Sequence, residues 1–140
     1  MKKSIYSLVL LAISCFGISV SQAQNKFDKW PEIKSFHKVL SQTFHPSETG
    51  DLSPIKSRSA ELAAKADTLN KSEIPAEFNK LEVKLALAKL SLESKSLHKM
   101  VTDKVSDAEI TKALNALHDT FHTIVEKCSD EEEHHHDHDH

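Results

Sequence analysis

Glycine is scarce in this sequence, with only two among 140 residues. Few glycines and few β-branched runs, together with many Ala, Leu, Lys and Glu residues, favour helices over sheets. A glycine-rich phosphate-binding loop is absent, and no nucleophile is paired with a base as in a hydrolytic enzyme. We therefore expect an all-α protein that is not an enzyme.

Cysteine is equally rare, and one of the two cysteines lies in an N-terminal leader. The chain begins with MKK, continues with an apolar run and reaches Ser21-Gln22-Ala23, which is the order of a secretory signal peptide. We expect residues 1–23 to be removed and the mature protein to be periplasmic or secreted. The alternatives are a retained membrane anchor, for which the run is short, and a lipid on Cys15. After cleavage Cys128 is alone, so an internal disulfide is excluded.

An excess of positive charge is also missing, since 18 Lys and Arg residues stand against 21 Asp and Glu residues. Residues 130–140 contain acids and histidines but no Lys or Arg. A nucleic-acid-binding surface needs a basic patch, and this acidic tail would repel a phosphate backbone. We therefore expect no nucleic-acid partner and, once the leader is removed, no membrane partner.

Residues 24–129 show helical periodicity in four segments, which makes this range one domain. The segments run over about 29–44, from Ser53 to a turn at 70–75, over 75–102, and from Ser106 onward. Apolar residues recur in each segment at spacings of three and four. In chain order, the expected inner faces are Trp30, Ile33, His37, Leu40 and Phe44; Ile55, Leu62, Ala66 and Leu69; Phe78, Leu81, Leu85, Leu90, Leu97 and Val101; and Ile110, Leu114, Leu117, Phe121, Ile124 and Cys128.

Capping and proline residues mark the ends of these segments. Asp28 is a candidate cap for the first helix, and Pro31 is tolerated in its first turn. We expect His45-Pro46 to end this helix, because the residue before a proline is pushed out of helical geometry. Ser106 and Glu109 form a Ser-x-x-Glu capping box at the start of the fourth helix. Short turns make neighbouring helices antiparallel, which predicts an up-down-up-down antiparallel four-helix bundle.

Histidines recur on the first and fourth helices. His118 and His122 are four residues apart, so their imidazoles share one helix face and can share an ion. His37 and His45 are eight residues apart, again on one side of a helix. If the two helices are antiparallel neighbours, His37 lies level with residue 121, between His118 and His122. We therefore expect these side chains to form a metal site, with His45 as its fourth ligand.

Other interpretations of these histidines remain open. Each could be an ordinary residue at the edge of the core, hydrogen-bonded to a carboxylate or to water. His45, Glu48 or Asp51 would reach the site of His37, His118 and His122 only if the connection after the first helix folds back. Imidazole nitrogens suit Zn, Cu, Ni and Fe, and the sequence does not select among these ions.

The chain ends in EEEHHHDHDH, a low-complexity segment without an apolar residue. We expect residues 130–140 to be a disordered His/Asp-rich tail. Most of its imidazoles are neutral at pH 7 and offer lone pairs, while the neighbouring carboxylates attract cations. A flexible, low-selectivity metal-binding segment is therefore expected at His134, His135, His136, His138 and His140. A solubilising acidic tail and a purification tag are the alternatives.

The stretches FHKVLSQTFHPSETGDLSPIK and LHDTFHTIVEKC, behind a leader, resemble small exported bacterial four-helix-bundle proteins of uncertain function, some associated with heavy-metal efflux. This resemblance would cover most of the mature chain. It implies a metal site at His37, His45, His118 and His122, and a component of a metal-efflux system as partner.

The architecture is also distantly similar to cytochrome b562 and cytochrome c′. The C-x-x-C-H motif that attaches haem covalently is absent. The non-covalent type uses a methionine on the first helix, where this chain has none and His37 would have to substitute.

The sequence thus predicts an exported protein that binds a divalent transition metal, Zn, Cu or Ni, and buffers or delivers it. The alternatives are a haem-b-binding electron-transfer bundle and a cofactor-free interaction module.

Overall fold

The computed structural model describes residues 26–129, so the expected signal peptide (1–23) and the His/Asp tail (130–140) lie outside the described residues. Within this range there are four long helices and no strand, which confirms the predicted all-α class for this part of the chain. In chain order the elements are α2 (Pro31–Glu48), α3 (Ser53–Lys71), the short 3-10 helix η1 (Ala76–Phe78), α4 (Leu81–Thr102) and α5 (Asp107–Lys127).

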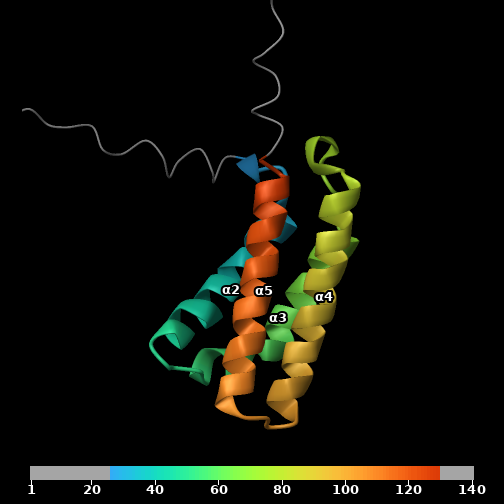
Figure 1. The fold of residues 1–140 in the computed structure, drawn as a ribbon. Helices are drawn as coiled ribbons and strands as arrows, with labels where there is room; N and C mark the ends of the chain where they lie inside the picture. The colour runs from blue at the N-terminus through green and yellow to red at the C-terminus, as the bar shows by residue number, and fades with distance from the viewer. Residues whose placement is uncertain (1–25, 130–140) are drawn as a thin grey trace, which may run out of the picture.

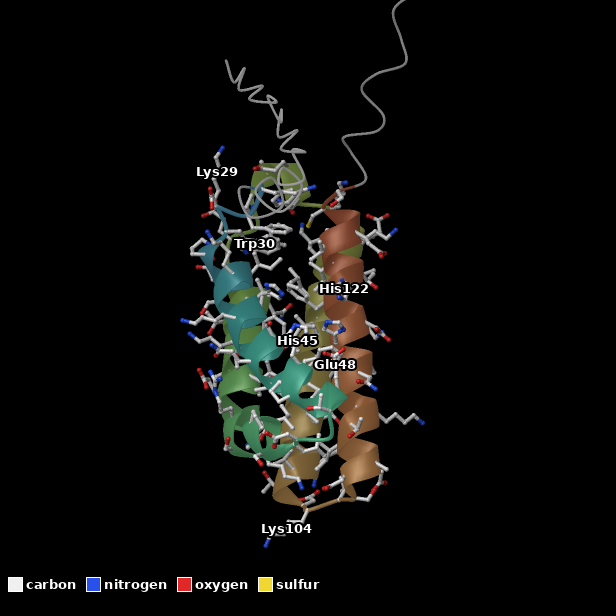
Figure 2. The ribbon with its side chains drawn as sticks, turned by 90° about the vertical axis from the view of Figure 1, so that its left-hand side faces the viewer. Lys29, Trp30, His45, Glu48, Lys104 and His122 are labelled. Atoms are coloured by element: carbon white, nitrogen blue, oxygen red, sulfur yellow. The ribbon has the colours of Figure 1, made fainter. Side chains whose placement is uncertain are left out.

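The four helices form a bundle in which consecutive helices run in opposite directions (Figure 1). Each helix packs against its neighbours in the chain, and α5 closes the bundle against α2. The α2–α5 contact is the loosest of these, and α2 is inclined to α5 in both views (Figure 1 and Figure 2). We call this contact the α2–α5 seam. None of the helices in the described range has the length and apolar character needed to cross a membrane.

An apolar core runs through the bundle and is closed at one end by aromatic rings. Trp30 is fully buried, stacks on Phe78 with ring centroids 6.0 Å apart, and donates from Nε1 to Ser72 Oγ at 2.9 Å. The predicted inner faces of α3 and α5 are confirmed, since every residue expected there is buried. Each fully buried Leu or Ile on these faces contributes roughly 1.5–3 kcal/mol to folding.

The ends of the helices follow the predicted capping in part. The capping box of α5 is confirmed: Ser106 Oγ accepts the Glu109 N–H at 3.3 Å, and Glu109 Oε2 accepts the Ser106 N–H at 3.1 Å. Pro31 opens α2, as expected. Asp28 does not cap this helix, and its carboxylate instead accepts from Lys34 Nζ at 2.8 Å.

The prediction that His45-Pro46 ends the first helix is wrong, because α2 continues to Glu48 with Pro46 inside it. A proline removes one backbone donor and crowds the preceding turn, but here the apolar contacts of the last turn outweigh that cost. Phe44 and Ser47 are both buried, and Ser47 Oγ donates to the Phe44 carbonyl at 2.6 Å. Gly50, at φ +87°, then supplies the left-handed residue that turns the chain toward α3.

Three residues that the sequence places on inner faces are exposed in the structure. His37 is exposed, and the neighbouring Phe36 occupies the core position instead. On α4, Leu81 and Leu85 are exposed, while Val83 and Leu87 are buried in their place. In addition, the segment expected as one helix from residue 75 is divided into η1 and α4.

The turn between α4 and α5 is a Schellman motif built around Lys104. Its φ of 55° is the left-handed conformation, which is common for glycine at this position and costs other residues energy. The Lys104 N–H donates to the Val101 carbonyl and the Val105 N–H to the Met100 carbonyl, both at 3.2 Å. These two bonds close the end of α4 and reverse the chain into the cap of α5.

Candidate metal centre

Two histidines of α5 are hydrogen-bonded to each other through their imidazole rings. The Nε2 atoms of His118 and His122 are 3.2 Å apart, and their rings are nearly perpendicular at 81°. Two imidazole nitrogens bound to one ion at about 2.0–2.1 Å lie about 3.3 Å apart in tetrahedral geometry and about 2.9 Å apart at a right angle. In the structure this contact is a hydrogen bond between the two Nε2 atoms. Its length falls between these two values, so it is also compatible with one bridging ion when both rings carry their proton on Nδ1.

Phenylalanines position the histidine rings of the seam. Phe44 of α2 stacks on His118 of α5, with centroids 3.7 Å apart and planes at 6°. In a second stack the two helices exchange roles: His37 of α2 stacks on Phe121 of α5, with centroids 5.0 Å apart and planes at 8°. Each helix therefore gives one imidazole and one phenyl ring to these two stacks. Both phenylalanines are buried, which limits how far the stacked imidazoles can move.

The stack of His37 on Phe121 agrees with the register expected from the sequence, which places His37 level with residue 121. His37 nevertheless has one ring face against Phe121 and remains exposed elsewhere. It is thus at the rim of the seam and not in the core.

His45 and Glu48 form a second potential ligand pair, on the last turn of α2. His45 Nδ1 donates to Glu48 Oε2 at 2.9 Å, and both side chains are exposed. Figure 2 shows His45 and Glu48 on α2 and His122 on α5, on the side of the seam that faces the viewer. Because α2 continues past Pro46, Glu48 belongs to this helix and not to the connection that follows it. Its carboxylate therefore lies on this side of the seam without the folded-back loop on which the prediction from sequence depends.

The histidines of the seam influence one another's protonation. Partial burial lowers the pKa of His37, and positive charge on His122 and His45 lowers it further. Partial burial also lowers the pKa of His118, and His122 adds to the effect. The carboxylates of Asp119 and Glu48 act in the opposite direction on the pKa of His118. The net result favours the neutral form of His37 and His118, which is the form that binds a metal.

The structure brings the predicted ligands to one seam but not into one coordination shell. Among residues 26–129, no three His, Cys, Asp or Glu side chains are close enough together to hold an ion. His118 and His122 are paired, while His37 is held by its stack and His45 by Glu48. The five tail histidines lie outside the described residues.

Two further groups are held in other roles. Asp51 Oδ1 accepts the Ser53 N–H at 2.9 Å, which places this carboxylate at the start of α3 and not in the seam. Cys128 is buried, and burial raises the pKa of its thiol to about 11. Since the thiolate is the form that binds metals, Cys128 is a poor ligand at neutral pH.

Comparison with protein-family models, curated proteins and solved structures gives no match for this chain.

Proposed function

We propose that this protein binds a divalent transition metal at the α2–α5 seam and buffers or delivers that ion. The observation that supports the proposal most is the 3.2 Å separation of His118 Nε2 and His122 Nε2. Two neutral imidazoles at this separation, each protonated on Nδ1, would be a bidentate ligand for Zn(II), Cu(II) or Ni(II). Export through the signal peptide, and a metal-efflux component as partner, are the parts of the proposal that rest on the sequence.

Water and the ligands of α2 complete the coordination in this proposal. His45 and Glu48 occupy the exposed last turn of α2, and rotation of their side chains can exchange their mutual hydrogen bond for bonds to the ion. An ion held by both helices would join the two most loosely packed neighbours of the bundle. Metal binding would then stabilise the fold by mass action. The His/Asp tail would raise the local concentration of metal beside this site.

The aromatic packing of the seam supports a metal ion over haem. The Phe36 and Phe121 rings are 5.6 Å apart, and Phe44 lies directly on His118. These rings fill the space between the helices that a haem macrocycle would need. Addition of haemin to the protein should therefore give no visible absorption band typical of axial histidine ligation.

Calorimetric titration with ZnCl2 and NiCl2 tests the proposal. We expect replacement of both His118 and His122 by Gln to weaken the tightest binding event by at least about tenfold, because the bidentate pair is lost. The matched control is His98→Gln, which removes a histidine of α4 that is bonded to Ser59 Oγ at 3.0 Å and lies outside the seam.

A variant without residues 130–140 distinguishes metal binding at the seam from metal binding by the tail. The proposal predicts that this truncation removes weak binding equivalents and leaves the tightest one. If the tightest event disappears with the tail and survives the double replacement in α5, the seam is not the metal site.

A further inference from the structure

Three leucines are exposed on one side of α4. Leu81, Leu85 and Leu92 are 68%, 62% and 69% exposed, respectively. Ala88, which is also exposed, lies between the last two. The four residues follow spacings of four, three and four, which is the alternation of a coiled-coil seam. We call them the α4 stripe.

The α4 stripe lies opposite the side of α4 that enters the core. The buried residues of α4 are Val83, Leu87, Leu90, Ser91, Ser94 and Leu97. With about 100° of rotation per residue, the stripe and the buried residues point in nearly opposite directions. The helices packed against α4 are α3 and α5, so no described element covers the stripe. Scattered exposed leucines are ordinary, but a continuous apolar stripe marks an interaction surface.

We propose that a second copy of this chain covers the α4 stripe, in an antiparallel α4–α4 pair. In that arrangement Leu81 of one copy lies opposite Leu92 of the other, and Leu85 lies opposite Ala88. A two-fold axis relates the two copies, so the same surface serves on both sides and the assembly closes as a dimer. This inference does not depend on metal binding.

The charges beside the stripe favour the antiparallel direction. Glu82 and Lys89 lie on the same side of the α4 stripe. In an antiparallel α4–α4 pair, this side of one helix lies against the same side of the other helix. The antiparallel pair therefore brings Glu82 of each copy close to Lys89 of the other. A parallel pair would instead bring Lys84 of one copy against Lys89 of the other. Lys89 is 65% exposed even though Glu93 is 3.5 Å away, so its side chain can reach the second copy.

Sedimentation equilibrium of the protein over micromolar to millimolar concentrations tests the pairing. We expect a concentration-dependent dimer whose dissociation constant rises at least about tenfold in Leu85→Lys, because a charge then enters the apolar seam. Ala64→Lys is the matched control, since it places a lysine on an exposed position of α3. Circular dichroism should show the same helix content in both variants.

Charge reversal tests the direction of the pair. Glu82→Lys and Lys89→Glu should each weaken the dimer several-fold, and the double variant should restore it. A dimer strengthened by Lys89→Glu alone would contradict the antiparallel pair, because that change favours a parallel one. A protein that stays monomeric throughout overturns the proposal. So does one that binds anionic phospholipid vesicles through Leu85 without forming dimers.

Discussion

The ring of Phe44 lies flat on the imidazole of His118, with centroids 3.7 Å apart and planes at 6°. Phe44 belongs to α2 and His118 to α5, so this stack is both a packing contact and a constraint on a proposed metal ligand. It links the stability of the loosest of the neighbouring helix pairs to the geometry of the candidate site. Substitution of Phe44 separates these two roles.

Phe44→Leu should weaken Zn(II) binding and also destabilise the fold. Leucine keeps an apolar side chain in this buried position, so we expect a loss of about 1 kcal/mol in the free energy of unfolding. Loss of the flat contact lets the His118 ring rotate away from His122 and should lower the affinity several-fold. Calorimetry and urea unfolding measure the two effects. Unchanged zinc affinity would show that the stack does not position His118.

Acidification from about pH 7.5 to about pH 5.5 should destabilise the protein. The pKa values of His37 and His118 are lowered in the folded state, so below about pH 6.5 the unfolded chain binds more protons than the folded one. Stability therefore rises with pH through this window and is lost as pH falls. Urea unfolding followed by the fluorescence of Trp30, the one tryptophan of the chain, measures the change. Replacement of both histidines by Gln should flatten the dependence.

Lys104→Gly should stabilise the protein by about 1 kcal/mol, because glycine adopts the left-handed conformation without the steric cost of a Cβ atom. Thermal unfolding measures the gain as an increase in Tm. The control is Lys112→Gly, on an exposed position inside α5, which should destabilise by about 1 kcal/mol. A decrease in Tm for Lys104→Gly would show that the Lys104 side chain stabilises this turn by contacts of its own.

Ser106→Ala should destabilise the protein by about 1 kcal/mol, because the N–H of Glu109 loses its acceptor at the start of α5. Ser57→Ala on α3 is the matched control, because Ser57 Oγ donates only to a carbonyl within its own helix at 3.1 Å. Equal stabilities for the two variants in urea unfolding would mean that the capping box contributes nothing measurable.

The sequence predicts the helices of this protein well where local signals agree. In α5 the capping box at Ser106 and the apolar repeat through Cys128 indicate the same helix and the same face, and both predictions are confirmed. In α4, by contrast, leucines lie on two opposite sides. Periodicity alone cannot decide between Leu85 and Leu87, because the choice depends on where α3 and α5 pack. The end of α2 is unpredictable for a similar reason, since burial of its last turn outweighs the local effect of Pro46.

The sequence predicts which residues lie at the candidate site but not how their rings are arranged. Spacing along the helix places His118 beside His122, and antiparallel packing places His37 level with Phe121. Which ring each imidazole stacks on depends on the inclination of α2, which results from packing along the whole seam. The apolar spacing along α2 carries no information on this inclination. It therefore predicts His37 in the core, whereas His37 lies at the rim of the seam.

The exposure of His122 and His45 at the rim of the seam has a kinetic consequence. In the proposed site, an incoming ion would meet these two exposed residues first and would only have to replace the hydrogen bond between His122 and His118. The rates of metal association and dissociation would then be set by ligand exchange on the ion and not by motions of the protein. Fast exchange of this kind would suit the delivery part of the proposed function better than long-term storage of the ion.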